Sequence, residues 1–462
     1  MNHFWTAQKI AEATQGKLIG NTDWSTVAFA IDSRALKVGN VFIALEGEKV
    51  DGHDFVKQVI DKGAIAAVVH KKLPSYPSNF PLILVEKTDK ALVNLGNYAR
   101  KNFKGKVVGV TGSAGKTSTK DMLAFCLADQ AKTHKSEKSF NTKLGVPLTI
   151  ANCPPASEFL VLEIGMSLPG EISLLTHIAK PDVAIITTIA HAHIEFLKSL
   201  DGVAKAKAEI FEGLQPNGTA IVNGDLDQTH ILVEKAKENN VKNIFLFGEN
   251  PACQTRLLKY EPSSAGCHIR AEILGEEVSY KLQAFGKHHA MNSLAVLTAL
   301  KMFKADLQKA IITIGNFTET EGRGKSYLLR DDILLVDESY NANPDSTRAA
   351  LIAFQERPIN GRRIVILGDM GELGPQSGLY HRNLKTTLQN MKIDFLFTYG
   401  PLMKELFQEA HQEIHAKHFD DLNELSEELT RIIKPKDELF IKSSKSTRLS
   451  LVAERIRKHY AV

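Results

Sequence analysis

Short apolar runs alternate with amphipathic stretches along the whole chain, which is the pattern of an α/β fold. In the first segment, Thr6 can cap a helix that passes through Ile10 and Ala13 and that Gly16 ends. Four apolar runs in this segment predict strands, at residues 27–31, 41–45, 64–69 and 82–85. We therefore expect a small α/β domain over residues 1–102.

The middle segment, residues 103–315, starts with the apolar run 106–111, a glycine-rich turn and a stretch of helical spacing over residues 118–127. Further strands are expected at residues 159–162 and 182–188. Because strands that alternate with helices pair in parallel, this segment should form a central domain with a mostly parallel sheet.

The third segment, residues 316–462, repeats the alternation of strand and helix. Its expected strands lie at residues 333–336, 363–367, 395–399 and 439–441. They end at Asp337, at Gly368 and Asp369, at Gly400 and at Lys442. Polar groups at the ends of such strands are typical of a doubly wound, Rossmann-like domain.

Composition and charge narrow the class of protein. The chain of 462 residues is 43% hydrophobic and 24% charged, as in globular proteins. Its net charge is only +4, and basic residues are interleaved with acidic ones, so we expect no nucleic-acid partner. The sequence shows no leader segment and no apolar run that could span a bilayer, which predicts a cytoplasmic protein without membrane insertion. The four cysteines are irregularly spaced and are expected to be reduced and mostly buried.

The stretch from Gly112 to Thr117 is the strongest chemical signal in the chain. It reads Gly112-Ser113-Ala114-Gly115-Lys116-Thr117, lies between an expected strand and an expected helix, and is followed by Ser118. Backbone N–H groups in such a turn cradle phosphates, a lysine lies along the outer phosphates, and a threonine hydroxyl ligates Mg²⁺. The strict P-loop pattern has a glycine where Val110 stands, so this is a shorter form. A turn with an incidental lysine is the alternative.

Two further groups should meet this phosphate loop. Glu163 follows the strand at 159–162, and His193 follows the strand at 182–188. Because the carboxyl ends of parallel strands form the ligand crevice, both are candidate Mg²⁺ ligands, although histidine is a less usual one. A solvated pair at a strand end is the alternative.

Other candidate residues are ambiguous from spacing alone. Lys207 lies one helical turn from Val203 and from Phe211, and spacing favours a solvated surface lysine there. The run Asp32-Ser33-Arg34 suits an anionic group, but surface turns often have this composition. Polar residues of the stretch 286–292 could hold a base or ribose, or only cap a helix.

These motifs together resemble the Mur ligase family of ATP-dependent amide-forming enzymes. The resemblance spans all three segments and includes Asp32-Ser-Arg34, Asp51-Gly-His53, Gly112 to Thr117, Phe140-Asn141-Thr142, Glu163-Ile-Gly165, Ala192-His193-Ile-Glu195, Lys207, Tyr340-Asn341-Ala-Asn343-Pro344 and Gly368-Asp-Met-Gly-Glu372-Leu-Gly374. The runs at 340–344 and 368–374 are the most specific, and they resemble the member that adds a dipeptide more than the members that add single amino acids. The resemblance implies that D-alanyl-D-alanine is joined to UDP-N-acetylmuramoyl-tripeptide through an acyl phosphate, at the expense of ATP, in peptidoglycan synthesis.

The resemblance also implies roles for individual residues. Lys116, Lys207, His193, Glu163 and Arg323 would be catalytic, and two Mg²⁺ ions would be held by Thr117, Glu163, His193 and a carbamylated Lys207. ATP would contact residues 112–118, Asn292, Arg323, Asp337, Tyr340, Asn341 and Asn343. The UDP precursor would contact Asp32, Ser33, Arg34, Gly47, His53, Asn141 and Thr142. A monomer is expected.

Three positions depart from the family pattern. His289 and Thr188 stand where the family usually has asparagine, and Lys445 replaces an arginine. Three alternatives remain. They are a folylpolyglutamate synthase, which shares the central domain and the chemistry, another Mur ligase that adds a single amino acid, and a nucleotide-binding regulator without catalysis. The sequence leaves open whether the third residue of the precursor peptide is lysine or diaminopimelate.

Overall fold

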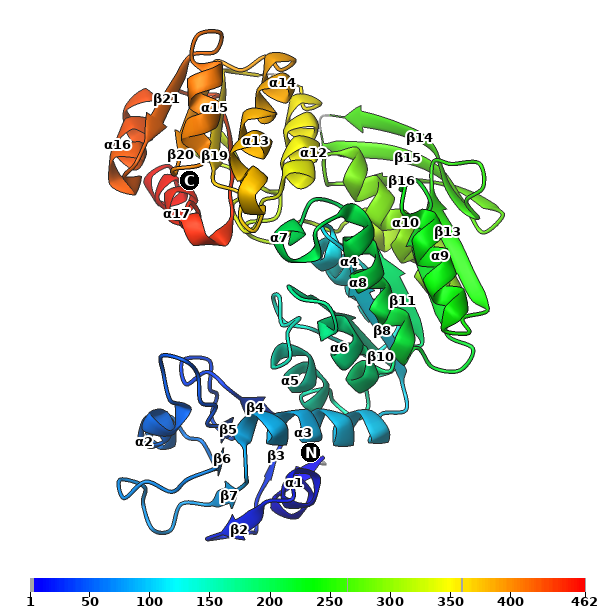
Figure 1. Ribbon diagram of the computed structural model, residues 1–462, viewed down its shortest axis with the longest axis vertical. Coiled ribbons are helices and arrows are strands. Elements are labelled where there is room, and N and C mark those ends of the chain that lie inside the picture. The colour runs from blue at the N-terminus through cyan, green and yellow to red at the C-terminus, as the bar shows by residue number, and fades with distance from the viewer. Residues whose placement is uncertain (1–3, 264, 359, 462) are drawn as a thin grey trace.

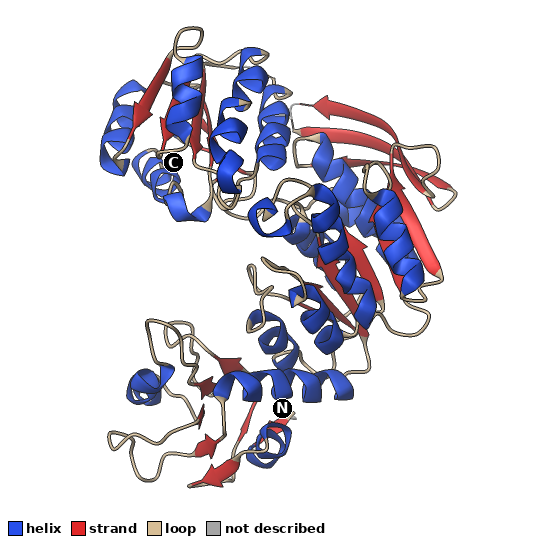
Figure 2. Cartoon of the chain, viewed as in Figure 1, coloured by secondary structure: helices blue, strands red, loops and turns tan. Residues whose placement is uncertain are grey.

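The computed structural model describes residues 4–263, 265–358 and 360–461, and it arranges three α/β units along a curved molecule (Figure 1). The N-terminal unit lies at one end, the C-terminal unit at the other, and the largest sheet between them (Figure 2). In this described part, no helix is both long and apolar enough to cross a bilayer. The four cysteines are free, and three of them are buried, as predicted.

The N-terminal unit contains a five-stranded sheet in the order β2-β7-β6-β5-β4. The strands are β2 (Lys17–Ile19), β4 (Phe29–Ala30), β5 (Val41–Ile43), β6 (Ala66–Val69) and β7 (Leu82–Leu84), and only β2 pairs antiparallel. A separate pair joins β1 (Trp5–Thr6) to β3 (Ser25–Thr26). The helices are α1 (Ala7–Thr14), α2 (Val56–Asp61) and α3 (Thr88–Asn102).

Helix α1 starts as predicted and ends differently. The Thr6 hydroxyl caps it by accepting a hydrogen bond from the amide of Lys9. At the other end Gln15, not Gly16, takes the left-handed conformation (φ 56°). Gly16 serves close packing instead, since a Cβ there would lie 2.5 Å from the Ile83 side chain.

The central unit has nine strands in the order β16-β15-β14-β13-β12-β11-β8-β10-β9. The strands are β8 (Lys106–Thr111), β9 (Thr133–Lys135), β10 (Phe159–Glu163), β11 (Val183–Ile186), β12 (Thr219–Asn223), β13 (Asn243–Gly248), β14 (Thr255–Ser263), β15 (Gly266–Ile273) and β16 (Glu276–Leu282). The helices are α4 (Lys116–Ala128), α5 (Gly145–Ala151), α6 (Glu171–Ala179), α7 (Ile194–Leu197), α8 (Leu200–Ala208), α9 (Thr229–Glu238), α10 (Lys287–Met302) and α11 (Leu307–Ile314). The sheet is mostly parallel, as predicted.

The antiparallel strands β14, β15 and β16 were not among the predicted strands. Their residues alternate between buried and exposed positions, so they form no continuous apolar run. A strand with one solvated face is therefore harder to recognise in the sequence than a buried parallel strand, which forms a continuous apolar run.

The C-terminal unit has six strands in the order β17-β18-β22-β19-β20-β21, and only β17 pairs antiparallel. The strands are β17 (Lys325–Leu328), β18 (Leu334–Glu338), β19 (Arg363–Gly368), β20 (Phe395–Tyr399), β21 (Ala416–Phe419) and β22 (Glu438–Lys442). The helices are α12 (Pro344–Gln355), α13 (Ser377–Arg382), α14 (Leu384–Gln389), α15 (Met403–Ala410), α16 (Leu422–Ile432) and α17 (Ser450–His459). Two apolar clusters, one with α12, α14 and α15 and one with α16 and α17, cover opposite faces of the sheet.

Helix α3 joins the N-terminal unit to the central one by packing against α5. A Cβ at Gly96 would lie 2.7 Å from the Pro147 Cβ, so the two helices meet where a side chain is missing. Replacing Gly96 by valine should lower the free energy of unfolding by about 1–3 kcal/mol, because the added methyl groups force the helices apart.

Chemical denaturation of Gly96→Val and of Asn97→Val checks this prediction. Asn97 lies next to Gly96 on the exposed side of α3, so its replacement introduces valine into the same helix without the clash. At neither position is valine a poorer helix former than the residue it replaces. Equal stability of the two variants would contradict close packing at Gly96.

Candidate functional site

The phosphate loop connects β8 to α4, as predicted. Gly112 (φ 151°) and Gly115 (φ 78°) have positive φ angles. A Cβ at Gly112 would lie 1.9 Å from the Thr187 hydroxyl, and one at Gly115 would lie 2.8 Å from Asn292 Oδ1. Both positions therefore need glycine, and the turn brings Asn292 of α10 against the loop.

Lys116 and Thr117 begin helix α4. The Lys116 ammonium donates to the carbonyl oxygen of Gly112 at 2.7 Å, so its side chain folds back over the loop, and burial lowers its pKa. The Thr117 hydroxyl donates to Glu163 Oε2 at 2.6 Å. The phosphate loop and the end of β10 are thus in direct contact, as the topology predicted.

Glu163 is a buried carboxylate with donors on both oxygens. Its side chain is 1% exposed, and Asn141 Nδ2 donates to Oε1 at 2.7 Å while Thr117 bonds Oε2. The Ser136 hydroxyl accepts a hydrogen bond from the Glu163 amide. These contacts fix both the backbone and the carboxylate.

Lys207 is buried, with 1% exposure, on α8. The expectation from spacing alone, a solvated surface lysine, is wrong, because packing of α8 buries this position within reach of the Lys116 charge. Burial lowers the pKa of Lys207 well below its ordinary value, and the charge of Lys116 lowers it further. The neutral amine is therefore easier to form than at an exposed lysine.

Two histidines after β11 meet carboxylates of the C-terminal unit. His193 Nδ1 pairs with Glu372, and this contact lowers the pKa of Glu372. His191 Nδ1 lies 2.7 Å from Asp345 Oδ2. A carboxylate on Nδ1 orients the His193 ring and leaves Nε2 as the nitrogen for a ligand.

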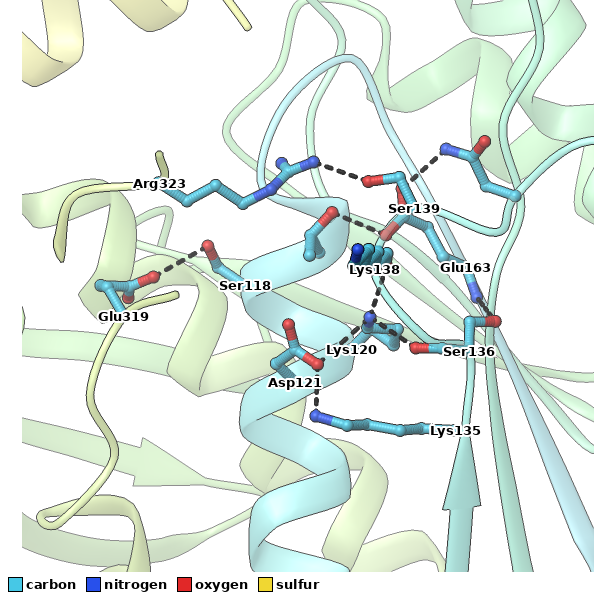
Figure 3. A network of polar contacts seen from close by, with 12 residues as sticks. Ser118, Lys120, Asp121, Lys135, Ser136, Lys138, Ser139, Glu163, Glu319 and Arg323 are labelled. Atoms are coloured by element: carbon cyan, nitrogen blue, oxygen red, sulfur yellow. Dashed lines mark hydrogen bonds and ion pairs between the residues drawn. The ribbon is translucent and has the colours of Figure 1, made fainter. Parts of the chain in front are cut away.

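Arg323 also crosses between these units. Its Nη2 donates to the Ser139 hydroxyl at 2.8 Å (Figure 3). Its guanidinium lies 4.0 Å from the centroid of the Tyr340 ring. Lys445 Nζ lies 5.6 Å from the same ring. The aromatic face therefore has two cations beside it, one of which contacts the central unit.

The other candidates in the C-terminal unit have local partners. Asn343 caps α12 by accepting from the Ser346 amide, and the Asn341 carbonyl accepts from Lys442. Asp337 is buried and accepts from the amide and hydroxyl of Ser339, and burial raises its pKa. The polar residues of the 337–343 stretch therefore stabilise local structure, whether or not they also contact a ligand.

A cavity of about 850 Å³ brings most of these groups together. Of the predicted residues, its lining contains Ser113, Ala114, Gly115, Lys116, Ser118, Asn141, Thr142, Glu163, His193, Asn292, Arg323, Tyr340, Asn341 and Asn343. Four of the predicted residues are not part of the lining: Gly112, Thr117, Lys207 and Asp337.

The predicted precursor residues of the N-terminal unit lie outside this cavity. Asp32 and Arg34 pair with each other on the surface, which lowers the pKa of Asp32 to about 2. His53 is fully buried: Nδ1 contacts Asp51 at 2.6 Å, and Nε2 accepts from the His70 amide. Both ring nitrogens thus hold local structure, and burial lowers the His53 pKa. The Ser33 carbonyl accepts from Lys62, and Gly47 lies in a tight turn closed by Val50.

Two departures from the family pattern have structural partners. The Thr188 carbonyl accepts from the Ser113 amide, a contact that does not depend on the side chain. His289 lies 2.9 Å from Glu319, and both side chains are buried. Glu319 in turn accepts from the Ser118 hydroxyl at 3.2 Å. Glu319 and Ser139 carried no sequence signal, since their roles depend on contacts between distant segments.

The donor set suits a magnesium ion. Mg²⁺ is commonly bound by one or two protein oxygens together with substrate phosphates. The oxygens of Thr117 and Glu163 lie 2.6 Å apart beside the phosphate loop and are such donors. Nowhere in residues 4–263, 265–358 and 360–461 do three His, Cys, Asp or Glu side chains gather into a metal site, so the protein oxygens here would need phosphate oxygens beside them.

Comparison with known proteins agrees with this geometry. The family models for the Mur ligase catalytic domain, the Mur ligase middle domain and the Mur ligase glutamate ligase domain match residues 28–98, 110–300 and 322–445. The chain is 32% identical over 454 residues to the UDP-N-acetylmuramoyl-tripeptide–D-alanyl-D-alanine ligase of Bacillus subtilis (strain 168), with 97% of each chain covered.

Solved structures of similar fold point to the same family. A MurF crystal structure from Acinetobacter baumannii superposes with a TM-score of 0.86 at 29% identity, covering 98% of this chain and 99% of that one. The MurF ligase of Thermotoga maritima in complex with ADP superposes with a TM-score of 0.79 at 27% identity, covering 94% and 97%. The chain therefore belongs to the Mur ligase family.

Proposed function

We propose that this chain joins D-alanyl-D-alanine to UDP-N-acetylmuramoyl-tripeptide, with hydrolysis of ATP to ADP and phosphate, in peptidoglycan synthesis. The observation that carries the proposal is the single cavity where the phosphate loop, Glu163 and Arg323 meet. It lies in a chain that aligns over nearly its whole length with ligases of that name. The product would be UDP-N-acetylmuramoyl-pentapeptide.

The reaction needs activation of a carboxylate. A peptide carboxylate is a poor electrophile, so its oxygen attacks the γ-phosphorus of ATP, ADP leaves, and an acyl phosphate forms. The free amine of D-alanyl-D-alanine then attacks the acyl carbon, and inorganic phosphate leaves from the tetrahedral intermediate with loss of a proton. The chain mainly has to position reactants and neutralise charge. Lys116 of the central unit and Arg323 of the C-terminal unit line the cavity and would supply the positive charge that offsets the phosphate charge.

Magnesium would be held by Thr117 at one position and by Glu163 and His193 at a second. The metal would neutralise the negative charge that develops on the transferred phosphoryl group. The Glu372 contact on Nδ1 of His193 would keep the ring oriented for that role.

Lys207 would supply a further anionic oxygen ligand as a carbamate. The neutral amine adds to CO₂ and one proton leaves, so the side chain changes from a neutral amine to an anionic carbamate. Burial beside Lys116 favours the neutral amine that this addition needs. Carbamylation would also place an anion near the Lys116 cation.

The remaining ligand contacts follow the cavity. ATP would occupy the phosphate loop with Asn292, Tyr340, Asn341 and Asn343 around the nucleoside and Asp337 on the ribose. The precursor would extend from Asn141 and Thr142 toward the N-terminal unit. There Asp32, Ser33, Arg34 and Gly47 would meet the UDP group, with the buried His53 ring supporting the loop. Closure of the C-terminal unit over this site would exclude water from the acyl phosphate.

The acceptor preference tests the proposed function. With Mg²⁺, ATP and UDP-N-acetylmuramoyl-tripeptide, phosphate release should rise at least about tenfold when D-alanyl-D-alanine is added, because amide formation consumes the acyl phosphate. Single amino acids, or folate with glutamate, should give no such rise. Release coupled to folate and glutamate would favour a folylpolyglutamate synthase, and release indifferent to every acceptor would favour a regulator. Tripeptides with lysine and with diaminopimelate are compared in the same assay.

Lys207→Ala should lose about 10²-fold or more in kcat, because the anionic oxygen ligand is removed. Small carboxylates added to the buffer should restore part of the activity by occupying the vacated space. Lys205→Ala is the matched control, since Lys205 is exposed on the same helix. Near-normal activity of Lys207→Ala without added carboxylate would remove this role.

A further inference from the structure

Lys120 is a buried cation on the same helix as the phosphate loop lysine. It lies one helical turn after Lys116, and its side chain is 1% exposed. Its ammonium donates to the carbonyl oxygens of Ser136 and Lys138, each at 2.9 Å (Figure 3). It also lies 3.1 Å from Asp121 Oδ1. The proposed chemistry gives this lysine no part.

The two carbonyls belong to a loop, residues 136–141, between β9 and α5. This loop carries three of the contacts that organise the site. Ser136 accepts from the Glu163 amide, Asn141 donates to the Glu163 carboxylate, and the Ser139 hydroxyl accepts from Arg323. Figure 3 shows the labelled residues of this network around the start of α4. The position of the loop therefore sets the position of groups on two units of the molecule.

The backbone of the loop is in a conformation that needs support. Lys138 has a φ of 47°, in the left-handed region that residues with a Cβ rarely adopt. Its own side chain is exposed, while its carbonyl oxygen accepts from Lys120. Without that donor, the buried Ser136 carbonyl and the partly buried Lys138 carbonyl would lose a charged hydrogen-bond partner.

A buried ammonium is costly unless charge and hydrogen bonds match it. Here Asp121 and two carbonyls supply the match, and Lys135 Nζ contacts the same oxygen, Asp121 Oδ1, at 2.6 Å. Lys135 is about half exposed and contacts the same carboxylate without holding the loop carbonyls. The chain thus offers two lysines that share one partner and differ in their contact with the loop.

We infer that Lys120 is a positioning residue for the ligase reaction: it holds the 136–141 loop, and through that loop it places Asn141 against Glu163 and Ser139 against Arg323. The inference rests on the proposed function, since it assigns Lys120 to the same phosphoryl-transfer site. It predicts that loss of Lys120 impairs the chemical step more than substrate binding, because the reacting geometry is disturbed while most ligand contacts remain.

Lys120→Met tests the inference, with Lys135→Met as the matched control. In the full chain, we expect kcat of Lys120→Met to fall about ten- to a hundredfold, with KM for D-alanyl-D-alanine within about twofold of the unsubstituted chain. The control should keep kcat within about twofold. Lys120→Arg, which keeps the charge and can still donate to carbonyls, should restore part of kcat. Combining Lys120→Met with Asn141→Ala should lose no more than the larger single effect, because both act on Glu163.

Hydrogen exchange gives a readout that does not depend on activity. Amides of residues 136–141 should exchange faster in Lys120→Met than in the control, while those of α4 and β10 stay protected. A kcat within twofold of the unsubstituted chain, additive losses with Asn141→Ala, or an exchange increase spread evenly over α4 and the sheet would each overturn the inference. If Lys120→Met does not fold, Lys120→Gln is judged by the same criteria. Absence of amide product with the unsubstituted chain would instead count against the proposed function, and the exchange result would still decide whether Lys120 holds the loop.

Discussion

The burial of the Glu163 carboxylate is the constraint on which the site depends. A carboxylate removed from water needs donors on its oxygens, and here these come from Thr117 on α4 and Asn141 on a separate loop. The three groups belong to segments that are neighbours because β10 pairs in parallel with both β8 and β9. The phosphate loop, the strand end and the loop before α5 must therefore be in place together. A shift of any one of them would leave a charged group without a partner.

Much of this arrangement could be predicted from the sequence because its determinants are local. The order of strand, glycine turn and helix around Gly112 and Gly115 follows from backbone requirements that only glycine meets without strain. The meeting of Glu163 with Thr117 follows from the rule that carboxyl ends of parallel strands share one edge. Local pattern and sheet topology were enough for these residues.

The remaining features depend on contacts between distant segments, which spacing cannot reveal. Lys207 and Lys120 look like ordinary helix lysines in the sequence, yet both are buried, because the faces of α8 and α4 are chosen by packing. Glu319 meets Ser118 across about two hundred residues of chain, and no motif marks it. In the N-terminal unit, the same residue types that suggest an anion site also form local pairs, as Asp32 and Arg34 do. Residue types alone could not distinguish an anion-binding site from local ion pairs, and only the family resemblance favoured the binding site.

Three polar contacts between the central and C-terminal units lie beside the cavity. Each of these contacts joins a residue of the central unit to one of the C-terminal unit. The pairs are His193 with Glu372, His191 with Asp345, and Ser139 with Arg323. Polar contacts of this kind are weaker than an apolar interface and suit a boundary that can open. Because the same residues line or flank the ligand space, docking of the C-terminal unit and completion of the site are one event. A reactive acyl phosphate would then be formed only where Arg323 is in place and water has been excluded.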